Sequence, residues 1–373
     1  MGNKLQNSKD KNINENQKEN LIEKLKKYIQ DNQLSRIEDF YYHPKNIHFS
    51  KELTVDSFTE EYSFFKFCTF LSINYVFYLI YTSKEMMSII FLDIINNKKI
   101  AEIKNAHSNN ISNLRYYLDK FKKIEYIISI SFKGNNLKIW NLSNLENILN
   151  LQNINNQDGI DSACIIKDNN ENYIITSNSS NSMYTASDPI KIFDFKGNKI
   201  KEIEDSSKRT FFIDNYYDNK TSVNYIITAN AGYAVTYNYN INKIYHKYSY
   251  NSNYDEIHSM KIDNTENIVK LIAACGDGNI RIWDFHLGIL LNQINCNSYL
   301  NSICLWDNEY AFVGCDNKMI KLVNLKTGEI IKDLIGHNNY ILDIQKIIHP
   351  KYGECLLSQG YQDDQIKLWV ILN

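Results

Sequence analysis

Leu271–Asp284 reads Leu-Ile-Ala-Ala-Cys-Gly-Asp-Gly-Asn-Ile-Arg-Ile-Trp-Asp, in which two short runs flank a polar turn. The turn, Gly276-Asp277-Gly278, has the residue types that favour a tight reversal of the chain. The second run, Ile280–Trp283, alternates apolar and polar side chains, as a half-buried strand does. The stretch therefore predicts a β-hairpin. Because one hairpin cannot bury its own faces, the same unit should recur along the chain.

The unit does recur, with a residue comparable to Asp284 at the close of each copy. The closing triplets, in chain order, are Phe91-Leu92-Asp93, Ile139-Trp140-Asn141, Ile192-Phe193-Asp194, Thr236-Tyr237-Asn238, Ile282-Trp283-Asp284, Leu322-Val323-Asn324 and Leu368-Trp369-Val370. Their last residues are 48, 53, 44, 46, 40 and 46 positions apart. A period in this range indicates a protein built from repeated small units.

The ending Ile-Arg-Ile-Trp-Asp resembles the close of a WD repeat, the four-stranded blade of a β-propeller. Such a blade takes roughly 40–45 residues, so the longer intervals imply extended loops. The resemblance covers residues 46–373 and implies an all-β fold, a seven-bladed WD-repeat β-propeller. The terminal Trp-Asp pair is intact only at Trp283-Asp284. A six-bladed ring, with residues 64–95 packed elsewhere, is the alternative.

Residues 1–45 are predicted to be an N-terminal extension. Residues 1–17 contain too few apolar side chains to stay ordered. A short amphipathic helix is predicted over residues 18–31, because apolar side chains recur at helical spacing at Leu21, Ile22, Leu25, Tyr28 and Ile29. This helix is expected to dock on the propeller or lie loose, or alternatively to contact a membrane surface or a partner.

The last repeat is one strand short of a blade, since the sequence stops soon after Val370. In the family this place is usually filled by an N-terminal strand, and Ile47–Val55 is the candidate. Closing the ring in this way would cover an otherwise unpaired sheet edge.

Composition excludes several classes of function. The net charge of −2 gives no basic field for nucleic acid. Seven cysteines without a Cys-x-x-Cys pair argue against a disulfide framework or a zinc site, so we expect a reducing, cytoplasmic setting. Phe64–Tyr81 resembles a membrane span, but Lys66 and Asn74 interrupt it, and its β-branched and aromatic residues predict strands.

WD repeats commonly stabilise a blade with a polar network: a His before the first strand, a Ser or Thr on the second, an Asp in the following turn and a Trp on the third. Blade seven matches with His337, Asp363 and Trp369, and Gln359 is assigned to the Ser/Thr position. The resemblance implies a structural role for these residues.

Two other blades match in part. Blade five retains Asp277 and Trp283, with Asn253 and Ala273 at the other two positions. Blade two retains His107 and Trp140, with Gly134 assigned to the position of the Asp.

Motifs for catalysis are missing from the sequence, including a phosphate-binding Gly-rich loop and a zinc-protease helix. No catalytic residue, metal ligand or cofactor is predicted. Because a propeller fold does not name a function, the resemblance alone favours a non-enzymatic scaffold that binds a protein or peptide on one rim. The alternative is a propeller enzyme or small-ligand binder. It would need titratable side chains at the central channel, which the apolar strand pattern does not supply.

The partner site is expected at the mouth of that channel. In the family, the residue three positions after each blade's His position starts the first strand there. Alignment on His337 gives Asn110, Gly159, Arg209, Glu256, Tyr299 and Tyr340. Of these, we predict Arg209, Glu256, Tyr299 and Tyr340 as partner-binding residues, since Arg and Tyr dominate interface hot spots.

The first four residues, Met-Gly-Asn-Lys, generate a separate prediction, because Gly2 could be acylated once Met1 is removed. The pattern departs at Gln6, where Ser or Thr is usual, and any chain can begin with Met-Gly. One acyl chain binds membranes only marginally, so nearby lysines would have to assist. A membrane is therefore expected as a partner only if Gly2 is acylated. Intact-mass analysis of native protein tests this: a retained Met1 or an unmodified glycine rules it out.

Overall fold

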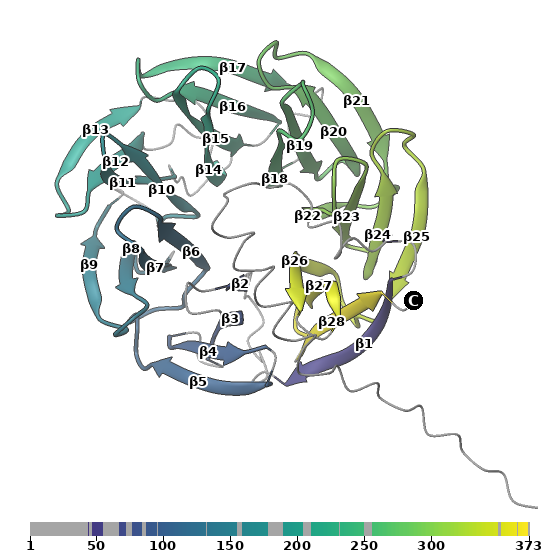
Figure 1. The fold of residues 1–373 in the computed structure, drawn as a ribbon, viewed down its shortest axis with the longest axis horizontal. Helices are drawn as coiled ribbons and strands as arrows, with labels where there is room; N and C mark the ends of the chain where they lie inside the picture. Colours follow the sequence, from purple (N-terminus) through teal and green to yellow (C-terminus); the bar gives the residue numbers. More distant parts are fainter. Residues whose placement is uncertain are drawn as a thin grey trace, which may run out of the picture.

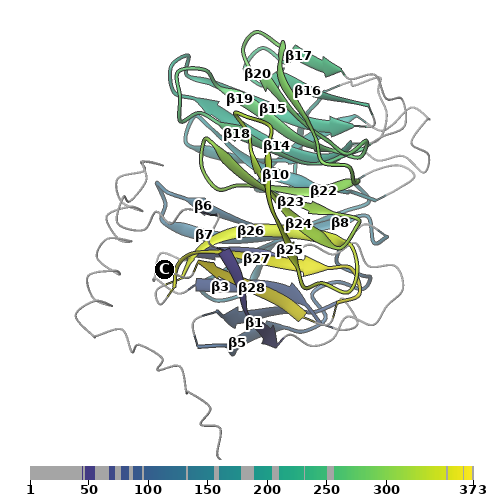
Figure 2. The same ribbon diagram turned by 90° about the vertical axis from the view of Figure 1, so that its right-hand side faces the viewer.

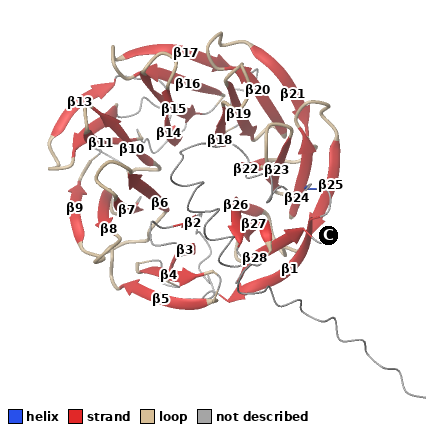
Figure 3. Cartoon of the chain, in the orientation of Figure 1, coloured by secondary structure: helices blue, strands red, loops and turns tan. Residues whose placement is uncertain are grey.

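Seven four-stranded antiparallel sheets surround a central axis in the computed structural model of the chain (Figure 1). The structure describes residues 44, 47–54, 67–71, 77–83, 87–94, 96–131, 133–154, 159–177, 189–203, 210–230, 232–249, 256–349, 352–363 and 365–371. In these residues, ordered structure is almost entirely strand, and Figure 3 shows strands and loops around the whole ring. The fold is the predicted all-β, seven-bladed propeller.

Each of the first six blades is a run of four consecutive strands. Blade one contains β2 (Cys68–Leu71), β3 (Phe77–Thr82), β4 (Ile89–Asp93) and β5 (Lys98–Ile103). Blade two contains β6 (Asn113–Asp119), β7 (Ile124–Ser131), β8 (Asn136–Asn141) and β9 (Asn147–Gln152), and blade three β10 (Ala163–Asp168), β11 (Glu171–Thr176), β12 (Ile190–Asp194) and β13 (Lys199–Ile203).

The same order continues in the second half of the chain. Blade four contains β14 (Thr210–Asp218), β15 (Val223–Asn230), β16 (Tyr233–Asn238) and β17 (Lys243–Ser249), and blade five β18 (Ile257–Asp263), β19 (Lys270–Cys275), β20 (Asn279–Asp284) and β21 (Leu290–Asn295). Blade six contains β22 (Leu300–Leu305), β23 (Tyr310–Cys315), β24 (Met319–Asn324) and β25 (Ile330–Ile335). Blade seven contains β26 (Ile341–His349), β27 (Gly353–Gly360), β28 (Gln365–Ile371) and, as its outer strand, β1 (Ile47–Thr54).

Burial follows the position of a strand in its blade. The middle strands are covered on both faces by the neighbouring blades, so β19 and β20 are buried along almost their whole length and consist mainly of apolar residues. The outer strands meet solvent: the exposed positions of β5 and β13 hold lysine and isoleucine, and the glutamates of these strands are half-buried. This division explains why the second and third strands gave the clearest repeat in the sequence.

The closing residue of each repeat caps the turn that follows it. Asp284 Oδ1 accepts hydrogen bonds from the backbone N–H groups of His286 (2.8 Å) and Leu287 (2.9 Å). The equivalent side chains in the other blades, Asp93, Asn141, Asp194, Asn238 and Asn324, accept from backbone N–H groups in the same way. Only a short side chain with an acceptor oxygen can do this, which explains the repeated Asp or Asn. Val370 needs no such cap, because no turn connects β28 to the outer strand of blade seven: that strand is β1, from the N-terminal part of the chain.

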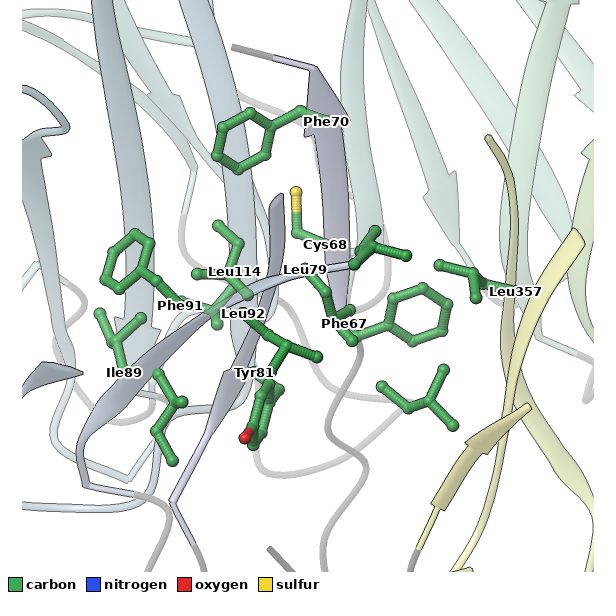
Figure 4. Packing of buried hydrophobic residues seen from close by; sticks show 14 of the residues in the cluster. Phe67, Cys68, Phe70, Leu79, Tyr81, Ile89, Phe91, Leu92, Leu114 and Leu357 are labelled. Carbon is green, nitrogen blue, oxygen red and sulfur yellow. The ribbon is translucent and has the colours of Figure 1, made fainter. Parts of the chain in front are cut away.

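Blade one is an integral part of the ring. Figure 4 shows its buried side chains, among them Phe67, Phe91 and Leu92, together with Leu114 from blade two and Leu357 from blade seven. The rings of Phe70 and Tyr116 stack across the boundary with blade two, with centroids 4.0 Å apart. The six-bladed alternative is therefore wrong. No helix in the described part of the chain is long and apolar enough to cross a membrane.

The ring closes through the N-terminal strand, which confirms the predicted role of Ile47–Val55. β1 pairs antiparallel with β28, and the register runs from Ile47 opposite Ile371 to Thr54 opposite Gln365. Lys332 Nζ of blade six donates a hydrogen bond to the carbonyl of Ile47 (2.8 Å). The predicted N-terminal extension, including Gly2 and the helix over 18–31, lies outside the described residues apart from residue 44.

Truncation tests the closure. Deleting residues 1–45 should leave a folded propeller, whereas deleting 1–57 removes β1 and exposes the edge of β28. We expect the longer deletion to aggregate or to lose several kcal/mol of unfolding free energy, measured by urea titration and size-exclusion chromatography. Equal stability of the two truncated proteins would show that β1 does not hold the ring together.

Candidate partner site at the channel mouth

Blade seven contains a complete polar network. His337 contacts Asp363 through Nδ1 and Ser358 Oγ through Nε2 (2.6 Å), and Trp369 Nε1 donates to the same Ser358 Oγ (2.7 Å). The hydroxyl position therefore belongs to Ser358, and the assignment of Gln359 is wrong. Neighbouring residues of a strand face opposite sides of the sheet, so an alignment shifted by one residue names the wrong side chain.

Blade two contains the same network with one replacement. His107 Nδ1 donates to Asn136 Oδ1, Ser129 Oγ lies 2.7 Å from His107 Nε2, and Trp140 Nε1 donates to Ser129 Oγ (2.8 Å). Asn136 therefore accepts the hydrogen bond from the histidine that an Asp accepts in blade seven, and the assignment of that position to Gly134 is wrong. The amide oxygen can only accept, so Nδ1 of His107 carries a proton.

The neutral state of His107 has a physical cause. Burial lowers the pKa of His107 to about 4, and the charge of Lys138 acts in the same direction, while the hydrogen bond to Asn136 opposes them. A positive charge in this enclosed place would lose its hydration.

Blade five lacks the histidine and uses its aspartate differently. Asp277 Oδ1 accepts from Arg281 Nη1 (2.9 Å), and Arg281 Nη2 pairs with Asp277 Oδ2 (2.5 Å). Burial alone would raise the pKa of Asp277, but the hydrogen bonds and charge of Arg281 hold it below its usual value. Trp283 is buried beside Tyr248. Asn253 lies outside the described residues, so its predicted place in this blade has no structural counterpart here.

All seven blades line a central cavity of about 1690 Å³, six of them through their innermost strands, β2, β6, β14, β18, β22 and β26, and blade three through Asp161 and Ser162, which precede β10. We call the end where these strands begin the mouth, and the opposite end the far end; Figure 2 shows the ring from the side. The cavity contains both acidic and basic side chains, so the expectation of an axis without titratable groups is wrong. Arg115 Nη1, for example, lies 3.6 Å from Asp214 Oδ1 and its Nη2 donates to Ser162 Oγ (3.2 Å).

Three of the predicted partner residues occupy equivalent positions at the mouth. The backbone carbonyl of Glu256 accepts from Gly276 N–H (2.8 Å), and that of Tyr340 from Tyr361 N–H (2.8 Å). The carbonyl of Tyr299 accepts in the same way from the N–H of Asp316 (3.0 Å). Each residue is thus joined to the turn between the second and third strands of its own blade.

A group of rings lies at the mouth across blades four, five and six. His258 Nε2 is 3.0 Å from Glu256 Oε2 and 2.8 Å from Tyr299 Oη. The ring of Phe211 lies beside His258 at 5.8 Å between centroids. Tyr299 also covers Gly276, where a Cβ atom would come within 2.6 Å of the phenol ring. Glycine is therefore needed at that position for Tyr299 to take its place.

Blade seven adds a second pair of rings. Tyr340 and Tyr361 stack with centroids 4.6 Å apart and planes 10° from parallel. Burial, followed by the nearby Tyr361 and Asp316, raises the pKa of Tyr340 to about 12, so its phenol stays protonated at neutral pH. Asp316 itself accepts a hydrogen bond from Asn301 Nδ2 (2.7 Å). The mouth is thus formed by aromatic rings and carboxylates from different blades.

The structure brings together most of the residues that the alignment placed at the mouth. Asn110, Glu256, Tyr299 and Tyr340 line the cavity, whereas Gly159 is buried and does not. Arg209 lies outside the described residues. The alignment missed Phe211, His258 and Asp316, because it considered one position per blade. Alternation along the first strand, from Glu256 to His258, is the signal that could have found the histidine.

Comparison with known proteins agrees with this geometry. The sequence model of the family described as WD domain, G-beta repeat matches residues 244–284, which run from β17 to the end of β20. That segment ends on the Trp283-Asp284 pair of a ring that has seven such blades. The chain is a WD-repeat β-propeller.

Two curated relatives share part of this propeller's sequence. U3 small nucleolar RNA-associated protein 21 homolog of Schizosaccharomyces pombe is 30% identical over 82 residues, which is 22% of this chain and 9% of that protein. Autophagy-related protein 16 of Arabidopsis thaliana is 26% identical over 91 residues, which is 24% of this chain and 17% of that protein. The similarity therefore spans less than a fifth of either relative. WD-repeat propellers are generally non-enzymatic scaffolds for protein interaction.

The low pKa of His107 predicts a pH dependence of stability. Because its pKa in the folded propeller is about 4, against about 6.5 unfolded, the unfolded state binds more protons between these values. Stability contributed by neutral His107 is thus full above pH 6.5 and decreases as the pH falls toward 4. From pH 7 to pH 5 we expect a loss of about 1–2 kcal/mol from this residue.

Urea unfolding of the wild-type protein and the His107→Gln variant at both pH values isolates the effect. The variant should have a lower unfolding free energy than the wild type at pH 7. Its unfolding free energy should decrease less than that of the wild type between pH 7 and pH 5. An equal loss in both proteins would contradict a neutral, buried His107.

Proposed function

We propose that this propeller is a non-enzymatic scaffold that binds a protein or peptide partner at the mouth of its channel. The observation that carries the proposal is the meeting of Glu256, Tyr299 and Tyr340, from three different blades, around one cavity. A partner placed there would contact several blades at once, on strands whose positions are fixed by the sheets. Aromatic side chains on such a rigid frame are the usual hot spots of protein interfaces.

The relatives support binding to other macromolecules only in general terms. One is named for association with a small nucleolar RNA and the other for autophagy. For this chain we propose a protein or peptide partner and no nucleic acid, because its net charge of −2 gives no attraction to phosphate. We propose a cytoplasmic location, which fits seven cysteines that are all buried thiols. A membrane contact would require acylated Gly2.

The competing function, a propeller enzyme or a small-ligand binder, would use the same channel. Several titratable groups on its wall interact with one another or with backbone. Arg115 pairs with Asp214, and Lys346 Nζ reaches Glu354 Oε1 (2.5 Å) and the carbonyl of Trp306 (2.7 Å). Among the described residues of the wall, no contact favours a reaction, so protein binding remains the proposal. A small molecule retained in the channel of native protein would reverse this preference.

Substitution of a mouth tyrosine tests the site. Partners are first captured by the immobilised full chain from a lysate of the native source, and each one is then purified for affinity measurement. Tyr340→Ala should weaken binding of the true partner by about 1–3 kcal/mol with little change in melting temperature. Arg209→Ala is expected to act similarly.

Tyr217→Ala provides the matched control. Tyr217 lies near the end of β14, away from the mouth, and is 47% exposed. This variant should bind the partner as the wild type does. If Tyr340→Ala lowers the melting temperature while the remaining folded protein binds normally, the partner site is not at the mouth.

A further inference from the structure

The mouth and the far end of the channel differ in charge. Glu256 and Asp316 lie at the mouth, and Asp161 and Lys133 also line the cavity. Farther along the innermost strands the lining contains three basic side chains, Arg115, Lys261 and Lys346, and two acidic ones, Asp214 and Asp343. Carboxylates at the entrance of a narrow, low-dielectric channel concentrate negative potential there and attract cations.

The rings at the mouth complement the carboxylates. Phe211, Tyr299 and the stacked pair Tyr340–Tyr361 lie close to Glu256 and Asp316. The negative face of an aromatic ring attracts a cation, most strongly where water is excluded. A lysine or arginine side chain can bury its apolar stem against such rings while its charged head meets a carboxylate.

Both carboxylates are held in position and retain hydrogen-bonding capacity. Glu256 Oε2 contacts His258, and Asp316 Oδ1 accepts from Asn301. A carboxylate has roughly four lone-pair sites, so these contacts orient each group and leave sites for a further donor. An ammonium or guanidinium donates several such bonds.

We infer that the partner is a basic peptide segment, one of whose lysine or arginine side chains enters the mouth between these rings and contacts Glu256 and Asp316. The inference rests on the proposed function, because it specifies the partner for the same site. Repulsion by the same carboxylates would disfavour acidic segments.

The test uses a display library of random 12-residue peptides, selected against the immobilised full chain. Selected sequences should be enriched in lysine or arginine. One synthetic consensus peptide is then measured by fluorescence anisotropy, beside a version in which norleucine replaces lysine and citrulline replaces arginine. We expect the uncharged version to bind about tenfold more weakly or worse, and added salt to weaken only the charged peptide.

Charge-neutral variants of the protein locate the contact. The double variant Glu256→Gln with Asp316→Asn should lose about tenfold or more in affinity for the basic peptide. The matched control is Glu171→Gln with Glu329→Gln, which changes the net charge equally at exposed positions of the far end. This control should bind within about twofold of the wild type, which separates a local contact from general attraction. Circular dichroism and melting temperature confirm that both variants fold.

The outcomes separate this inference from the proposed function. Selected peptides that are sensitive to Tyr340→Ala but lack basic residues, or bind the Glu256/Asp316 variant normally, overturn the basic segment and leave the partner site in place. Basic peptides that respond equally to the mouth variant and its control also overturn it. Failure to select any peptide that Tyr340→Ala weakens counts against both.

Discussion

The pairing of β1 with β28 is the interaction on which the rest of the structure depends. It joins residues at opposite ends of the described chain, Ile47 beside Ile371, and completes the sheet of blade seven. Blade seven then packs against blade one, where Thr69 N–H donates to Gln345 Oε1 (3.0 Å) and Gln345 Nε2 donates to the carbonyl of Phe67 (2.7 Å). Each blade buries its faces against two neighbours only when the ring is closed. Because the closing contact is so distant in sequence, it carries a large loop-closure cost during folding.

The candidate partner site is a consequence of this closed ring. No single blade contains it: Glu256, Tyr299 and Tyr340 come from blades five, six and seven, and Phe211 from blade four. Their backbone is fixed by equivalent hydrogen bonds to neighbouring turns, so the side chains approach one another without a conformational change in their own loops. Inter-blade packing therefore sets the geometry of the mouth, and a change that loosens the ring would affect binding indirectly.

Features that depend on local sequence could be predicted. The period of the closing residues gave seven blades because each Asp or Asn caps a turn through its own side chain, a short-range requirement visible in any copy.

Features that depend on which face of the sheet a side chain occupies could not be predicted. Ser358 and Gln359 are adjacent, and only the pairing of β27 with its neighbours decides which of them faces His337. Asn136 replaces an aspartate two residues beyond the expected place, because it is the first residue of β8, whereas Asp363 lies in the turn before β28. The group around His258 was missed since its members meet only through tertiary packing.

The direction of the closing strand also determines how the ring would respond to mechanical force. Ile47 and Ile371 are opposite each other at the same end of the β1–β28 ladder. Tension applied through the two ends of the described chain would therefore load one hydrogen-bonded pair at a time, from that end toward Thr54 and Gln365. Hydrogen bonds loaded one after another break at lower force than hydrogen bonds that are loaded together when two strands are pulled along their length. β1, the strand that closes the ring, is thus also the strand that tension between the two ends of the described chain would separate first.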